Sequence, residues 1–309
     1  MTRKMTGKRV GAALAALSLS LGLVACGSDS ESGDGGGGDG GGGGGGDAKQ
    51  ITLGIIPSWT DGLSTAYLWK NLLEEQGYQV EIQELSEAAP LYTGLAEGDV
   101  DVYPSAWPEV THKSYMEQYG DRLEDLGAYY DNAKLTFAVP EYTDIDSIED
   151  LTGNADRFGG KIIGIEPGAG LTEVTKKSVM PEYGLEGDYE LVTSSTTSML
   201  AELQKAIDDK QDIVVTLWRP FWANNAFPVK DLEDPKGALG EPEALHMLAR
   251  KGFSEDFPEV ADMMGKAKLD DEQYGTLEDL VVNEFGEGKE ADAITKWLED
   301  NPDWKSSLS

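Results

Sequence analysis

From Gln50 onward, short apolar runs alternate with stretches in which apolar residues recur every three to four positions. Short apolar runs predict β-strands, and the helical spacing predicts amphipathic helices between them. In the first helical stretch Leu68 and Leu72 share one side, and Gly77 follows as a typical C-terminal cap. The elements predicted up to residue 103 are strands over 51–57, 78–84 and 100–103 and helices over 63–75 and 89–97.

A second series of the same kind follows Pro140. The pattern predicts strands over 161–165, 189–193 and 212–217 and helices over 171–183 and 198–208. In each series the order βαβαβ predicts a parallel sheet covered by helices. The end of the chain differs, because three helices are predicted there, over 257–266, 270–284 and 290–300.

Two α/β units followed by helices are typical of the bilobal, periplasmic-binding-protein-like (type II) fold, whose lobes are joined by a hinge and close on a solute. We expect one lobe to comprise residues 49–138 plus about 246–309, and the other to comprise residues 139–245. The chain would then cross between the lobes near residues 139–142 and 240–246.

The residues before these units differ in composition. Basic residues and then an apolar stretch occupy residues 1–26, which predicts an export signal. This stretch ends in Leu-Val-Ala followed by Cys26, the only cysteine of the chain. Such an ending resembles the lipobox of bacterial lipoproteins, in which the cysteine is lipidated; the alternative is a plain signal with an incidental cysteine. Residues 27–48 are rich in glycine and predict a flexible linker that tethers the folded body to the outer face of the membrane.

Composition narrows the function further. The chain of 309 residues has 57 acidic and 25 basic side chains, a formal net charge of -32. This charge argues against binding to nucleic acid or to anionic lipid surfaces. One cysteine and two histidines without metal-ligand spacing predict neither a disulfide framework nor a metal site. Motifs for a serine nucleophile and for nucleotide binding are missing, so we expect no catalytic residue, no cofactor and no ATP hydrolysis by this chain.

Tryptophans cluster at the predicted carboxyl ends of strands, where ligands bind in open α/β sheets. Trp59, Trp107 and Trp218 occupy such positions, and Trp222 follows one helical turn later. Several aromatic faces around a void form a box for a quaternary ammonium ion, which has no N–H to donate. Each of these rings taken singly is more often a cap on the hydrophobic core.

Four motifs occur in the order found in one family. They are Ser105-Ala106-Trp107-Pro108 with Thr111-His112, the segment 164–170 (Gly-Ile-Glu-Pro-Gly-Ala-Gly), the segment 218–222 (Trp-Arg-Pro-Phe-Trp) and the segment 246–252 (His-Met-Leu-Ala-Arg-Lys-Gly). Together they resemble the glycine betaine/proline betaine-binding proteins of ABC importers, over nearly the whole predicted body. The resemblance implies a non-enzymatic protein that carries an osmoprotectant to a permease driven by an ATPase subunit.

The resemblance also implies site residues. Trp107 and Trp218 match tryptophans that stack on the trimethylammonium group, and the amides of Gly62 and Leu63 match those that hold the ligand carboxylate. A third cage tryptophan comes from the C-terminal helices in some members and from the Pro-Gly-Trp-Gly loop in others. Here the corresponding residues are Leu269 and Tyr274, or Ala169, so we infer that Trp59 completes the box.

Several assignments stay open. Glu166 either faces the cation or, more often for such a residue, caps the following helix or bonds the loop backbone; Trp222 and Tyr274 are further candidates for ligand contact. His112 and His246 are expected to be structural hydrogen-bonding residues, and Arg219 could pair across the cleft or on the surface. Glycine betaine, proline betaine, carnitine and choline all suit such a box. The alternatives are a binding protein for another small solute and an extracytoplasmic acid hydrolase; a monomer is expected in each case.

Overall fold

The computed structural model describes residues 49–309. The predicted signal over 1–26, its lipidation site Cys26 and the linker over 27–48 therefore lie outside the described residues.

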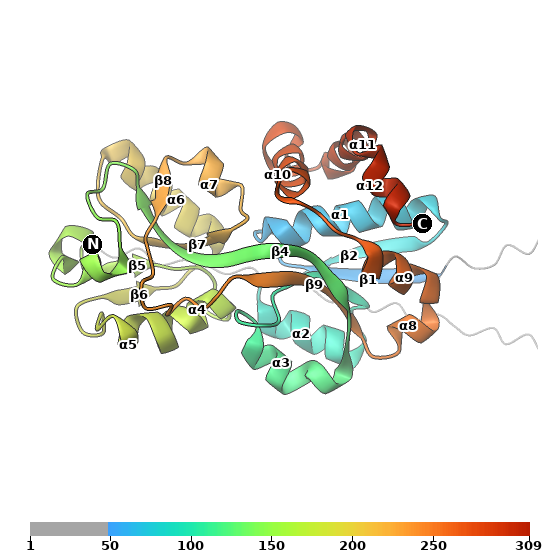
Figure 1. The fold of residues 1–309 in the computed structure, drawn as a ribbon, viewed down its shortest axis with the longest axis horizontal. Coiled ribbons are helices and arrows are strands. Elements are labelled where there is room, and N and C mark those ends of the chain that lie inside the picture. Colours follow the sequence, from blue (N-terminus) through green and yellow to red (C-terminus); the bar gives the residue numbers. More distant parts are fainter. Residues whose placement is uncertain (1–48) are drawn as a thin grey trace, which may run out of the picture. The chain divides into compact units, whose positions relative to one another are not determined.

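The first half of the sheet follows from the first series of apolar runs. β1 (Gln50–Ile55) pairs in parallel with β2 (Gln79–Glu84) on one side and with β3 (Val102–Ala106) on the other. Ile51, Leu53 and Ile55 of β1 are fully buried, and helices cover both faces of this part of the sheet (Figure 1). α1 (Thr60–Glu75) packs on one face, and α2 (Ala88–Glu97) and α3 (Lys113–Tyr119) lie on the other.

The second half repeats this arrangement. β5 (Lys161–Ile163) lies between β6 (Glu190–Val192) and β7 (Val215–Arg219) and is parallel to both. Its helices run over Gly170–Val174 (α4), Met180–Glu182 (α5), Thr196–Asp209 (α6) and Ala223–Ala226 (α7). A π-helical stretch, Thr175–Val179, joins α4 to α5, so the single helix predicted over 171–183 is confirmed as one continuous helical segment. The parallel pairing predicted for both units is also confirmed.

Two strands that the sequence pattern did not predict connect these halves. β4 (Leu123–Pro140) pairs with β9 (Glu243–Arg250) over its first part and with β7 and β8 (Val229–Asp231) over its second part. The strand order is β2-β1-β3-β9-β4-β7-β5-β6, with β8 beside β4. In Figure 1, β4 and β9 run side by side from one group of helices to the other. The chain was predicted to cross between the halves at residues 139–142 and 240–246, which fall at the end of β4 and the start of β9. β4 begins well before the first of these ranges, and β9 ends after the second.

The helices of residues 271–307 return to the first half of the sheet and lie on the same side as α1 (Figure 1), whereas residues 253–266 form two helices that contact each other and, through the second, β4. Their bounds are Phe253–Asp256 (α8), Pro258–Lys266 (α9), Asp271–Asp279 (α10), Glu290–Asp300 (α11) and Pro302–Ser307 (α12), with a π-helical stretch at Leu280–Phe285. Trp297 and Trp304 are buried here with their rings in edge-to-face contact. Over residues 49–309, the helices are all too short or too polar to cross a bilayer.

Candidate functional site

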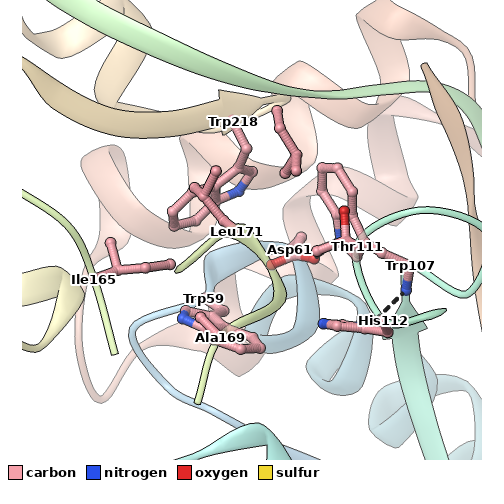
Figure 2. A pocket seen from close by; sticks show the side chains of 10 residues that line it. Trp59, Asp61, Trp107, Thr111, His112, Ile165, Ala169, Leu171 and Trp218 are labelled. Atoms are coloured by element: carbon pink, nitrogen blue, oxygen red, sulfur yellow. Dashed lines mark hydrogen bonds between the residues drawn. The ribbon is translucent and has the colours of Figure 1, made fainter. Parts of the chain in front are cut away.

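A cavity lies where the strand ends of the two sheet halves meet. It holds about 340 Å³ of space free of atoms and is partly open to solvent. Three of its lining residues are tryptophans, as Figure 2 shows. The lining residues are Trp59, Asp61, Trp107, Thr111, His112, Leu135, Ile165, Ala169, Leu171 and Trp218.

Trp59 enters the cavity from the turn between β1 and α1. Its backbone N–H donates to the carbonyl of Ile56 at 2.9 Å, and the residue stands immediately before the first turn of α1. The indole Nε1–H donates to Glu166 Oε2 at 3.1 Å. One face of the ring stacks on His112, with 6.1 Å between centroids and 18° between planes. Both the edge and one face of this ring are therefore held in place.

Trp107 follows β3 and belongs to the same half of the sheet as Trp59. Its indole Nε1–H donates to Asp61 Oδ2 at 3.0 Å, and its backbone N–H donates to His112 Nδ1 at 3.1 Å. Trp218 comes from the second half, near the end of β7, and stacks on Phe221 at 4.1 Å. Its neighbour across the sheet is Leu135 of β4, which also lines the cavity.

Asp61 is the only charged residue among those that line this cavity in the described chain. It is 3 % exposed and accepts hydrogen bonds at Oδ2 from Trp107 and from the Ser105 hydroxyl, the latter at 2.6 Å. Burial raises the pKa of its carboxyl, while the hydrogen bonds oppose that rise. A carboxyl group in a pocket whose other lining residues are uncharged and mostly aromatic or apolar favours a cationic ligand and can also accept a hydrogen bond from one.

His112 supplies the second polar group. Burial lowers its pKa to about 3, so the imidazole is neutral at ordinary pH. Because Nδ1 accepts from the Trp107 amide, the proton of the neutral ring is assigned to Nε2. Figure 2 shows this second nitrogen on the side of the ring that faces Trp59. The histidine that we expected to be structural does make a structural bond, and it lines the cavity as well.

The remaining candidate residues do not line the cavity within residues 49–309: Gly62, Leu63, Glu166, Trp222 and Tyr274. The Leu63 amide already donates to the carbonyl of Trp59 at 3.2 Å, so it has a partner within the chain. Tyr274 is buried against Tyr129 and Tyr130.

Three further residues have partners that the sequence could not assign. Glu166 does not line the cavity: its carboxylate accepts from the Trp59 indole, behind that ring, and from the Thr196 amide at the start of α6, which is not the helix that directly follows it. Arg219 of β7 pairs with Asp231 of β8, with Nε and Oδ2 2.6 Å apart, and His246 pairs with Asp125. Within the described part of the chain, acidic and histidine side chains do not gather into any group able to hold a metal ion.

Two lining residues, Leu135 and Leu171, carried no functional signal in the sequence, and Thr111 and Ile165 lay within family motifs but were not expected to contact a ligand. Asp61 directly precedes Gly62, whose amide was the expected ligand contact, and its carboxylate is one of 57 acidic groups in the sequence. Its burial, which only the fold determines, is what distinguishes it. Thr111 is fixed by the buried carboxylate of Glu243, which accepts from the backbone amides of residues 109, 110 and 111.

Glu278 is another buried carboxyl group near this site, and it predicts a pH effect on stability. Glu278 of α10 is 3 % exposed and accepts a hydrogen bond from the Thr60 hydroxyl. Burial raises the pKa of Glu278 to about 8 from 4.5, and the neighbouring Asp61 carboxylate adds to the rise. In the folded state the Glu278 carboxyl group therefore keeps its proton at pH values at which the same group in the unfolded chain has lost it. Stability is full below pH 4.5 and falls as the pH rises to about 8, by at most about 1.4 kcal/mol per pH unit.

Replacing Glu278 by Gln removes this titration. Between pH 5 and pH 9 we expect Tm to fall less in Glu278→Gln than in the wild type, measured by differential scanning calorimetry. The exposed Glu299→Gln variant makes the same charge change on α11 and should keep the wild-type slope. Equal slopes in all three proteins would show that Glu278 does not titrate in this range.

The chain matches a family model over most of its length. This model, described as the substrate binding domain of an ABC-type glycine betaine transport system, matches residues 49–300. A glycine betaine/carnitine transport binding protein of Listeria monocytogenes serotype 1/2a (strain 10403S) is 39% identical over 162 residues, which are 51% of each chain. The chain thus spans about half the length of this curated relative.

Solved structures agree with this match. A glycine betaine/L-proline-binding protein from Borrelia burgdorferi has a TM-score of 0.77 at 32% identity, covering 84% of this chain and 100% of the other. Lactococcal OpuAC, in its closed-liganded conformation with glycine betaine, has a TM-score of 0.77 at 30% identity, covering 84% and 99%. An ABC-transporter choline binding protein in complex with choline has a TM-score of 0.75 at 25% identity, covering 84% and 91%. The mixed α/β, periplasmic-binding-protein-like fold predicted from the sequence is confirmed.

Proposed function

Because the chain belongs to the family of substrate-binding domains of ABC-type glycine betaine transport systems, we propose that it captures glycine betaine or a closely related quaternary ammonium compound and delivers it to an ABC permease. Members of this family bind a substrate and are not enzymes, so an acid hydrolase is no longer a competing interpretation. An associated ATPase would supply the energy, and osmoprotection is the physiological role that such a ligand serves. Export, with a lipid anchor at Cys26, is the location that the N-terminal sequence supports.

The single observation that carries the proposal is the cavity with three tryptophans and no basic residue among those described around it. A quaternary ammonium group offers no hydrogen-bond donor, so attraction comes from aromatic faces, at about 0.5–2 kcal/mol for each ring. Trp59 and Trp107 come from the first half of the sheet and Trp218 from the second. Residues from both halves meet the same ligand only when the halves are closed, and such contacts favour closure.

We therefore propose two lobes, residues 49–138 plus about 246–309 and residues 139–245, which close by bending at the crossovers of β4 and β9. The polar end of the ligand would meet His112 and Asp61 in place of the Gly62 and Leu63 amides. The Nε2–H of His112 can donate to a carboxylate, and the Asp61 carboxyl can accept from a hydroxyl. The first contact suits glycine betaine or carnitine, and the second suits choline.

The experiment that tests this function is calorimetric titration of the purified protein with glycine betaine, carnitine, choline and proline, followed in parallel by tryptophan fluorescence. We expect saturable binding of at least one trimethylammonium compound, with a change in emission because the rings that contact the ligand are tryptophans. Proline, which lacks the trimethylammonium group, serves as the control and should bind more weakly. If none of the methylated compounds binds, the proposed function is wrong.

A further inference from the structure

Glu166 is a buried acidic residue that does not line the cavity and has no part in the function proposed above. It follows β5 in the second half of the sheet and is 5 % exposed. Its carboxylate accepts four hydrogen bonds from two segments far apart in the sequence. On one side the donors are the Ser58 hydroxyl and the Trp59 indole, each at 3.1 Å. On the other side they are the Thr196 amide at 2.9 Å and the Thr196 hydroxyl at 2.8 Å, at the start of α6.

These four bonds use both oxygens of the carboxylate. Oε1 accepts from Ser58 and from the Thr196 amide, and Oε2 accepts from the Trp59 indole and from the Thr196 hydroxyl. Hydroxyl groups can turn to become acceptors, but the indole and the backbone amide can only donate. Each oxygen therefore has one donor that cannot reverse its role. A glutamine side chain has a single oxygen, so it can satisfy only one of these two donors in either orientation.

The hydrogen bond from the Trp59 indole to Glu166 helps to set the orientation of that ring in the cavity. His112 stacks on one face of the indole, and Glu166 holds the nitrogen edge. His112 belongs to the same half as Trp59, whereas Glu166 belongs to the other half, so both contacts hold the ring in the closed state. Without the contact to Glu166, the ring would have to be ordered when the ligand binds, and its lost freedom would reduce affinity.

The segment 166–170, which begins with Glu166, joins the two halves of the sheet at a second place. The Gly168 amide donates to Glu87 at 3.1 Å, and its carbonyl accepts from the Tyr115 hydroxyl at 2.7 Å. Glu87 precedes α2, and Tyr115 lies in α3, so both belong to the first half. Glu166 thus stands at one end of a bridging segment, next to the start of α6 and in contact with one wall of the cavity.

We infer that Glu166 is a positioning residue that fixes the Trp59 ring as the third wall of the cage and ties it to α6 of the second half of the sheet. This inference rests on the proposed function, since the cage matters only if a cationic ligand fills it. Formation of the complete cage and closure of the two halves then depend on the same carboxylate.

The test is the Glu166→Gln variant, titrated with the ligand that binds the wild-type protein most tightly. Loss of a charge-assisted, buried hydrogen bond predicts an affinity about 10- to 100-fold lower. The loss should appear mainly as faster dissociation, measured by stopped-flow fluorescence, because the bond acts in the closed complex. Glu173→Gln is the matched control. Glu173 also bridges the halves, accepting from Ser114 at 2.8 Å, but its side chain is one-third exposed and its other partner is Lys177, not a cage ring, so affinity should stay within about twofold.

A double-mutant cycle separates positioning from simple helix capping. Trp59→Phe keeps an aromatic face and removes the indole donor. If Glu166 acts through Trp59, the fold-loss of affinity caused by Glu166→Gln should be at least five times smaller in the Trp59→Phe background than in the wild-type background. An equal loss in both backgrounds would assign Glu166 to capping of α6 alone and overturn the inference.

A measurement on the indole N–H keeps this test independent of the proposed function. The Trp59 indole resonance, identified by its disappearance in Trp59→Phe, should move in Glu166→Gln, in the free protein or on addition of ligand. If the wild-type protein binds no methylated ammonium compound, the proposed function fails while this resonance still reports on the contact. A resonance that is identical in the two proteins under both conditions would overturn the inference.

Discussion

Replacing Trp218 by Ala should lower the affinity for the quaternary ammonium ligand by about 30- to 100-fold. A desolvated cation over a tryptophan face gains about 2 kcal/mol, and each 1.4 kcal/mol corresponds to a tenfold change in affinity. Removing the ring also opens one side of the cavity to water. Trp218 is 5 % exposed and is the only one of the three cage tryptophans that the second half of the sheet contributes among the described residues. The variant therefore loses both the cation–π contact and a contact that favours closure.

Two further variants identify the cause of that loss. Trp218→Phe keeps a smaller aromatic face, so its affinity should lie between those of the wild type and Trp218→Ala. Trp222→Phe is the matched control, because Trp222 lies four residues away, contacts Phe221 and does not line the cavity. Titration calorimetry measures each affinity, and circular dichroism checks that each protein is folded. An affinity of Trp218→Ala within threefold of the wild-type value would remove Trp218 from the ligand site.

How much of the fold the sequence predicts depends on the kind of strand. β1 and β5 are short, apolar and covered on both faces, and such strands give continuous apolar runs. β4 differs, because its first part reads Leu-Glu-Asp-Leu-Gly-Ala-Tyr-Tyr-Asp-Asn. The register against β9 shifts between Asp125 and Gly127, and again on both sides of Tyr130. Each shift reverses which side chains face the core. Apolar and polar residues therefore do not alternate regularly along this part of β4, and the sequence does not predict a strand there.

The residues of the candidate site also differ in how far the sequence predicts them. The tryptophans were predictable because the residue is rare and three of them stand at strand ends, where an α/β sheet places its ligands. Asp61 and Glu278 were not predictable, since their importance arises from burial in a chain where carboxylates are abundant. The position of Glu166 against Trp59 joins residues 107 positions apart. Local pattern carries no information about such a pair.

The contact between the segment 166–170 and the loop 107–112 gives the second large effect that we expect. Gly170 begins α4 and faces the backbone of Thr111 so closely that an added Cβ would lie 1.9 Å from the Thr111 carbonyl oxygen. Thr111 cannot yield, because Glu243 binds its amide at 2.9 Å and its hydroxyl as well. A methyl group at Gly170 must therefore push the segment 166–170 away from the loop that carries Trp107 and His112.

Gly170→Ala should consequently lower ligand affinity by at least about 100-fold, since a cage whose walls come from both halves cannot form around the ligand when they are held apart. The core of each half is untouched, so we expect Tm of the free protein to change by only a few degrees. Gly275→Ala is the matched control, because Gly275 lies in α10 with no atom within 4 Å of an added Cβ, and alanine is the better helix former. Its affinity should equal that of the wild type.

Small-angle scattering distinguishes closure from local damage in the same variants. Wild type and Gly275→Ala should become more compact when saturated with ligand, whereas Gly170→Ala should keep the dimensions of its free form at the same ligand concentration. Normal affinity and normal compaction in Gly170→Ala would show that the segment 166–170 and the loop 107–112 need not meet for binding. A Gly170→Ala protein that fails to fold would show instead that the two halves form one unit that does not open, which contradicts the proposed hinge.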